Sequence, residues 1–149
     1  MSEPVSFGRR MGAVLYDTLL VGGSLIIIGG ILSTLLARSL GVDYLAPDSN
    51  AAHFMQLVYL LLAFGFFGWF WTHGGQTLGM RAWKIRVVDL NNNPLTWTQA
   101  GMRFLWSLAS WMVFGLGFVL AFFDPDKLTL HDRMSKTRLI KVTDNKTKK

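Results

Sequence analysis

Three charged residues lie beside long apolar stretches of the chain: Arg10, Asp17 and Asp132. Arg10 and Asp17 are seven residues apart, which is two helical turns, so one face of a helix would carry both side chains. An arginine flanked by two carboxylates at a boundary of low dielectric is stabilised by Coulomb attraction. Two roles fit such a group. One is a salt-bridge cluster that holds the tail of the chain against the first helix. The other is a cation or proton site, since ionisable groups at membrane depth are costly and mark ion pathways.

The elements that must position these residues are three stretches without any charge, residues 18–37, 54–72 and 104–123. Each is close to the roughly 20 residues that a helix needs to cross a hydrocarbon core about 30 Å thick, and none has the polar face of a surface helix. Hydrophobic residues make up 51% of the chain and charged residues 16%, against about 25% charged in soluble domains. The sequence predicts an all-α membrane protein with two transmembrane helices plus a third apolar segment.

The net charge of +6 predicts membrane orientation rather than nucleic-acid binding. Positive residues of short loops prefer the cytoplasmic side. They occur in the N-terminal segment and between the second and third apolar stretches, at Arg9, Arg10, Arg81, Lys84, Arg86 and Arg103. The loop after the first stretch has Arg38 against Asp43 and Asp48. We therefore expect a cytoplasmic N-terminus, an external loop at 38–53 and no nucleic-acid partner.

Two short β-rich runs point to a small cytoplasmic β element. Residues 85–89 partly alternate between apolar and polar side chains and end in Asn91-Asn92-Asn93-Pro94, which is typical of a strand and turn. Residues 138–142 form a second run of the same kind. Because two isolated strands are marginal in water, each is the other's best partner, and both must then lie on one side of the membrane. This places the C-terminus in the cytoplasm as well.

A cytoplasmic tail constrains the third apolar segment, residues 104–123. Gly115 and Gly117 lie near its middle, so we predict a re-entrant hairpin, which is tolerated where protein covers its irregular backbone. A third complete crossing is the alternative, and it would place the positive tail outside.

The sequence closely resembles the RDD family of small membrane proteins, named for one Arg and two Asp. The motifs that carry the resemblance are Arg10-x-x-Ala13-x-x-x-Asp17, Gly75-Gln76-Thr77-Leu78-Gly79 and Thr129-Leu130-His131-Asp132-Arg133. It covers residues 7–142 as a single domain within 1–149, followed by a short basic tail at 143–149 that we expect to be disordered. The resemblance implies that Arg10, Asp17 and Asp132 are the eponymous residues. Met80 stands where the family often has Lys.

The glycine-containing motif predicts a sharp turn out of the bilayer, built by Gly75, Gln76, Thr77 and Gly79. We expect Gly75 and Gly79 to adopt backbone conformations that other residues avoid.

Other chemistry is sparse. There is no Cys, and His53 and His73 bracket the second stretch, so they should lie on opposite sides of the membrane. A site shared by His73 and His131 is conceivable, but the histidines form no metal motif, and no catalytic pattern of an enzyme occurs. We expect no enzymatic activity, no metal and no cofactor.

The family implies a multi-pass protein of the bacterial inner (plasma) membrane, of which some relatives are reported as cation/proton antiporters and others resemble assembly scaffolds. The leading hypothesis is cation/proton exchange, with Asp17 and Asp132 as carriers and Arg10 tuning their charge. The alternative is a non-transporting scaffold or assembly factor in which the trio is structural. Besides the lipid bilayer, we expect a homo-oligomer or a membrane protein partner, because two or three spans cannot enclose a route alone.

Overall fold

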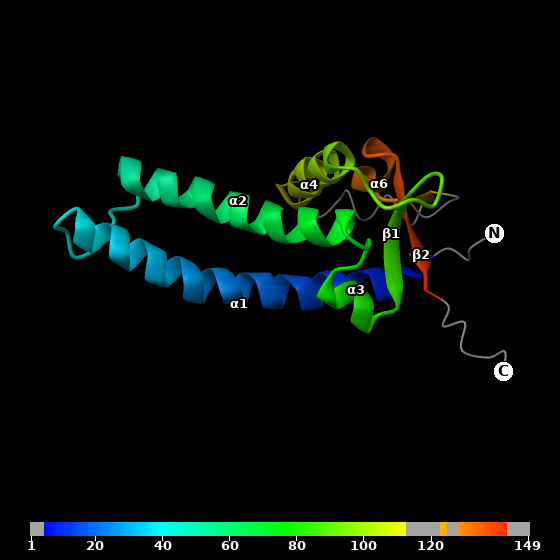
Figure 1. Cartoon of the computed structure of the whole chain (residues 1–149), viewed down its shortest axis with the longest axis horizontal. Helices are drawn as coiled ribbons and strands as arrows, with labels where there is room; N and C mark the ends of the chain where they lie inside the picture. The colour runs from blue at the N-terminus through cyan, green and yellow to red at the C-terminus, as the bar shows by residue number, and fades with distance from the viewer. Residues whose placement is uncertain (1–4, 113–122, 125–127, 143–149) are drawn as a thin grey trace.

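A long helical hairpin with a small module at one end forms the molecule (Figure 1). The computed structural model describes residues 5–112, 123–124 and 128–142. Helices α1 (Phe7–Ser39) and α2 (Asn50–Thr72) make the hairpin. The module contains, in chain order, α3 (Leu78–Ala82), β1 (Ile85–Asp89), α4 (Trp97–Met112), α6 (Leu130–Met134) and β2 (Thr137–Lys141).

The hairpin contains the two predicted membrane-spanning helices. Both α1 and α2 are long and apolar enough to cross a membrane, and within their most apolar windows only 6% and 17% of residues are buried in the protein. The core helix of a soluble protein would be mostly buried, whereas here side chains such as Ile26 remain 78% exposed. Hydrocarbon is the solvent in which this surface is stable, because apolar area exposed to water is unfavourable.

The helices of the hairpin touch where small residues allow it. Tyr59 of α2 donates a hydrogen bond to the carbonyl oxygen of Gly29 in α1, at 3.0 Å. A Cβ at Gly29 would come within 2.7 Å of the Tyr59 ring, so the glycine lets the two helices approach.

The predicted pairing of the two β runs is confirmed. β1 and β2 form an antiparallel two-stranded sheet in which Val87 pairs with Leu139. The second strand begins and ends one residue earlier than the prediction. Ile85, Val87 and Leu139 are buried in a core shared with Trp71 of α2 and Phe104 of α4, so the sheet depends on the helices for its stability.

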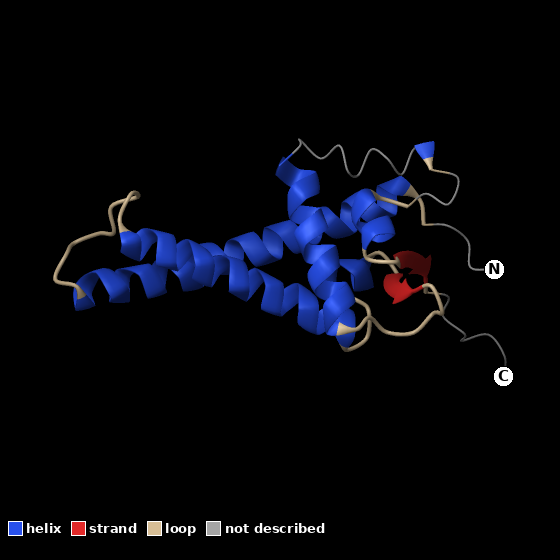
Figure 2. Cartoon of the chain, turned by 90° about the horizontal axis from the view of Figure 1, so that it is seen from above, coloured by secondary structure: helices blue, strands red, loops and turns tan. Residues whose placement is uncertain are grey.

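Helix α4 runs across the end of the hairpin rather than along it (Figure 2). The ring of its Phe104 lies 5.4 Å from that of Phe64 in α2, measured between centroids. The third apolar segment therefore begins inside α4. Its middle, with Gly115 and Gly117, lies outside the described residues, as does the tail at 143–149.

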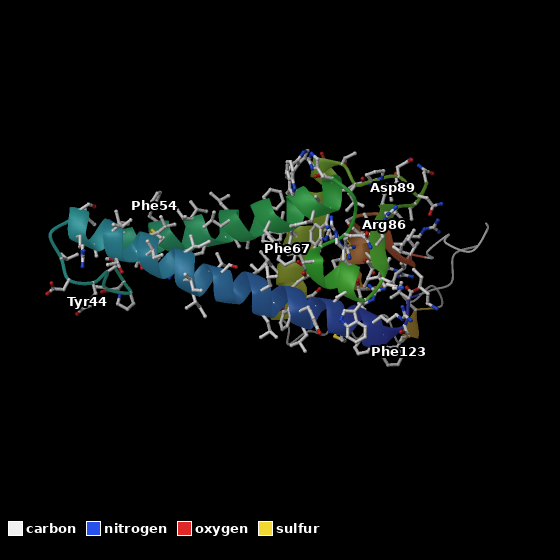
Figure 3. All side chains as sticks on the ribbon, turned by 60° about the horizontal axis from the view of Figure 1, so that its bottom comes forward. Tyr44, Phe54, Phe67, Arg86, Asp89 and Phe123 are labelled. Carbon is white, nitrogen blue, oxygen red and sulfur yellow. The ribbon has the colours of Figure 1, made fainter. Side chains whose placement is uncertain are left out.

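The far end of the third segment lies at the module end of the molecule. Figure 3 shows Phe123 at the same end of the molecule as Arg86 and Asp89, opposite to Tyr44 in the loop that joins α1 to α2.

Candidate functional site

The carboxylate of Asp132 is the centre of a buried charged cluster. Thr129 is the N-cap of α6 and forms a capping box with Asp132: the backbone N–H of Thr129 donates to Asp132 Oδ2 at 3.1 Å, and that of Asp132 donates to Thr129 Oγ1 at 3.4 Å. Arg10 Nη1 of α1 also donates to Asp132 Oδ2. Arg103 Nη1 of α4 donates to Asp132 Oδ1 at 2.5 Å. One side chain thus joins α1, α4 and α6.

Arg103 is fixed by contacts on several sides. Its Nη1 also donates to Thr137 Oγ1 of β2, at 2.8 Å, and its guanidinium lies 5.3 Å from the centroid of the Trp71 ring, a cation–π distance. Arg10, Arg103 and Asp132 are at most 4% exposed. Buried charges need such partners, because an unpaired one is very costly.

The charges of this cluster decide its protonation. Burial raises the pKa of Asp132, but the charges of Arg103 and Arg10 outweigh burial and hold that pKa well below the usual range of a carboxyl. Burial, aided by the positive charge of Arg103, lowers the pKa of the neighbouring His131 to about 3. At neutral pH Asp132 is therefore ionised and His131 is neutral.

Asp17 makes a second, separate connection between α1 and the module. Thr77, the N-cap of α3, donates its hydroxyl to Asp17 Oδ2 at 2.5 Å. The backbone N–H of Gly79 donates to Asp17 Oδ1 at 2.9 Å. Asp17 and Thr77 are 4% and 0% exposed, so this carboxylate is held by two neutral donors rather than by a cation.

The expected trio is therefore divided. Arg10 and Asp132 lie together, but the hydrogen bonds of Asp17 go to Thr77 and Gly79. Instead of one arginine between two carboxylates, the structure has one carboxylate between two arginines. Sequence reasoning missed Arg103, whose signal was its position directly before the third apolar segment.

Gly75 and Gly79 have different reasons to be glycine. Gly75 has a φ of +71°, as expected for a turn that only glycine adopts easily. Gly79 is in the helical conformation of α3, so the expectation for it was wrong. It is small because a Cβ would lie 2.4 Å from the carbonyl oxygen of Ala13 in α1.

The turn after α2 is tied to β1 by hydrogen bonds. The N–H of Val87 donates to the carbonyl oxygen of Gly75 at 2.7 Å, and Gln76 Nε2 donates to that of Ile85 at 2.7 Å. The predicted turn residues thus connect a membrane helix to the sheet.

An internal repeat underlies the two connections to α1. Residues 77–86 and 129–138 share the pattern Thr-Leu-x-x-Arg-x-x-Lys-x-Arg. Each copy has an N-capping threonine, a short helix, a lysine with a φ of +52° and a strand. Val87 and Leu139, each ten residues after its threonine, pair with each other, so a local two-fold axis relates the copies.

This repeat explains why α1 carries opposite charges. In the first copy the position of Asp132 is occupied by Met80, and Asp17 of α1 supplies the carboxylate to Thr77 and Gly79. In the second copy the helix has its own carboxylate, Asp132, and α1 supplies Arg10. The repeat was visible in the sequence and would have linked Thr77 with Thr129.

A cavity of about 420 Å³ lies between α1, α2 and α4. Arg10, Asp17, Arg103 and His131 line it near the module, and apolar side chains such as Leu25 and Leu60 line the remainder. Arg10 and Asp17 therefore border one space, whereas Asp132 does not line it.

Fold and site together define a membrane-type protein in which a two-helix hairpin is clamped to a small sheet module by buried arginine and aspartate. The model of the RDD family matches residues 4–136, which include Arg10, Asp17 and Asp132. The chain belongs to the RDD family. Comparisons with curated proteins and with solved structures gave no match.

Proposed function

We propose that this protein is a scaffold or assembly protein of the bacterial inner membrane that acts by binding, without transport or catalysis, and that its Arg and Asp trio is structural. The observation that carries the proposal is the state of Asp132. Its carboxylate is 0% exposed and is bound by two guanidinium groups and by its own helix N-terminus.

Asp132 is poorly suited to carry a proton or a cation. A carrier in an exchanger must take up and release its ion in every cycle, with a pKa near the working pH. The pKa of Asp132 is held far below that range by Arg103 and Arg10. Two guanidinium groups on one carboxylate leave the cluster with a net positive charge, which disfavours a bound cation.

Asp17 could give a cation only one carboxylate, and that carboxylate already accepts hydrogen bonds from Thr77 and Gly79. Hard cations such as Mg²⁺ and Ca²⁺ take six or more oxygen ligands, whereas the cavity beside Asp17 is lined mainly by carbon. Both carboxylates are thus explained by the clamp between α1 and the module.

The topology that we propose has two crossings, with residues 104–123 re-entrant from the cytoplasm. Arg103, before this segment, pairs with Asp132, and Asp124, after it, pairs with Arg133 at 2.9 Å. Asp132 and Arg133 are neighbours in α6. A straight helix of 20 residues is about 30 Å long, so its two ends cannot both reach adjacent residues.

Orientation follows from charge. The positive residues of the module, together with Arg9, favour a cytoplasmic module and cytoplasmic chain ends. With the natural absence of Cys, single cysteines can test this. An impermeant reagent should label Asp43→Cys from outside the cell, and Asn92→Cys and Lys149→Cys only after the membrane is opened. External labelling of Lys149→Cys would contradict the re-entrant segment.

A partner within the membrane is part of the proposal. Gly23 and Gly30 of α1 are two helical turns apart, and a Cβ at either would meet nothing within 4 Å in the described part of the chain. Small residues let transmembrane helices approach closely. Since neither glycine packs against another part of the described chain, contact with a second copy or another membrane protein gives them a role.

The decisive test is cation-dependent dissipation of a pH gradient in proteoliposomes. We expect purified wild-type protein to be silent with Na⁺, Li⁺ and K⁺ across a range of pH. If wild type responds, and folded Asp17→Asn and Asp132→Asn proteins reconstituted at equal yield do not, exchange is established and the scaffold proposal fails.

A further inference from the structure

The cavity between α1, α2 and α4 has the form of a site for an amphiphile. It follows α1 from Arg10 to Leu25, which at 1.5 Å per residue is about 22 Å. Its polar residues lie at the module end, and the wall beyond them is apolar, with Val21, Leu60 and Leu108 among its members. A ligand that matches this wall has a long hydrocarbon part and one polar end.

Trp71 supplies a hydrogen-bond donor at the polar end. Its side chain lines the cavity and is 6% exposed, and its Nε1–H has no hydrogen-bond partner in the described part of the protein. A buried donor of this kind is unfavourable unless an acceptor reaches it. Tryptophan N–H groups in proteins usually find one.

The neighbour of Trp71 restricts what can bind there. The Arg103 guanidinium, also a cavity-lining group, lies over the indole ring. Arginine and the indole N–H have donors and no acceptor. An oxygen of a phosphate, carboxylate or ester fits beside these groups, whereas an ammonium head group does not. Asp17, which also lines the cavity, has its own two donors, Thr77 and Gly79.

We propose that this cavity binds one acyl chain of an acidic membrane phospholipid, with a phosphate or ester oxygen accepting from Trp71 Nε1. The chain lies along the apolar wall formed by α1, α2 and α4. This inference needs the membrane hairpin but not the scaffold role, so either proposal can fail without the other.

The test uses full-length protein, stripped of lipid in detergent, and a single-chain acidic probe, lysophosphatidylglycerol. Native mass spectrometry counts bound molecules, and the midpoint of thermal unfolding is followed during titration. We expect one bound molecule and a saturable rise of the midpoint. The neutral monoacylglycerol of the same chain length should bind at least about tenfold more weakly, the equivalent of one charged hydrogen bond.

Paired variants locate the site. Leu25→Trp fills the cavity and should abolish binding, whereas Ile26→Trp, at the next and exposed position, should bind as wild type does. Leu108→Trp is a second cavity-filling variant if Leu25→Trp does not fold. Trp71→Phe keeps a ring but removes the donor, and should weaken binding about fivefold.

Three results would overturn the proposal. The first is equal binding by Leu25→Trp and Ile26→Trp, which would place the lipid on the outside of the protein. The second is unchanged affinity in Trp71→Phe. The third is tenfold tighter binding of a free fatty acid than of the lysophospholipid, which would assign the cavity to a soluble carboxylate ligand.

Discussion

Replacing Asp132 with Asn removes one negative charge from between two buried arginines, with almost no change in shape. The amide keeps one acceptor oxygen, so one of the two guanidinium groups loses its acceptor. Arg10 and Arg103, at 4% and 3% exposure, both lose the negative charge they share. Breaking a buried ion pair by removing one partner costs about 3–5 kcal/mol. Since folded domains are stable by only about 5–15 kcal/mol, Asp132→Asn should lower the unfolding midpoint by roughly 10 °C.

The assay is thermal unfolding of purified protein in detergent, read by gel filtration of the fraction that survives heating. Asp43→Asn is the matched control, because Asp43 is exposed in the loop at the far end of the hairpin. A second substitution, Arg103→Met, should change stability in opposite directions in the wild-type and Asp132→Asn backgrounds. Arg103→Met should destabilise the wild-type protein, yet it should raise the stability of Asp132→Asn, because there it removes a buried charge that has lost its partner.

The cluster would not be a structural clamp if Asp132→Asn melted within about 3 °C of wild type, a difference of roughly 1 kcal/mol. The same conclusion would follow if Arg103→Met had equal effects in both backgrounds.

Three other predictions follow from the site. His131 has a pKa of about 3 in the folded protein and near 6.5 in the unfolded chain, so between these pH values the unfolded chain binds more protons. The free energy of unfolding should therefore fall as pH drops from 6.5 to 4.5, by up to about 1.4 kcal/mol per pH unit. The unfolding midpoint of His131→Gln should depend less on pH over this range than that of wild type. Gly79→Ala should destabilise the protein by more than about 2 kcal/mol, because its Cβ meets a backbone oxygen of α1. Gly101→Ala, whose Cβ would meet no described atom within 4 Å, should stabilise α4 by up to about 1 kcal/mol. Chemical denaturation of the two variants side by side checks both values. Thr77→Val removes the hydroxyl that donates to Asp17 and should cost about 1–3 kcal/mol, whereas Thr77→Ser should be nearly neutral; equal losses in both would show that the methyl group matters instead.

Some local features could be predicted because their signals are short in sequence. The apolar stretches at 18–37 and 54–72 predicted α1 and α2, since the length of an uncharged run is matched to the membrane. The β-rich runs predicted β1, β2 and their pairing, because neither strand is stable alone. Gly75 was correctly assigned a positive φ.

The site was less predictable because its partners come from separate elements. Helical spacing correctly placed Arg10 and Asp17 on one helix, and both are buried. That spacing carried no information on which segment each would meet. Gly79 was misjudged because the sequence does not reveal that the backbone of α1 lies against it.

By itself, the sequence determined the membrane character of this protein, its two long helices, its paired strands and the identity of three of its buried charges, because each depends on composition or on spacing along the chain. The tertiary structure decided how those charges are satisfied. It places Arg103 beside Asp132, and it places Thr77 and Gly79 where they donate hydrogen bonds to Asp17. It did so because a buried charge takes the partner that packing places within reach, and packing joins residues from α1, α4 and α6 that are far apart in the chain.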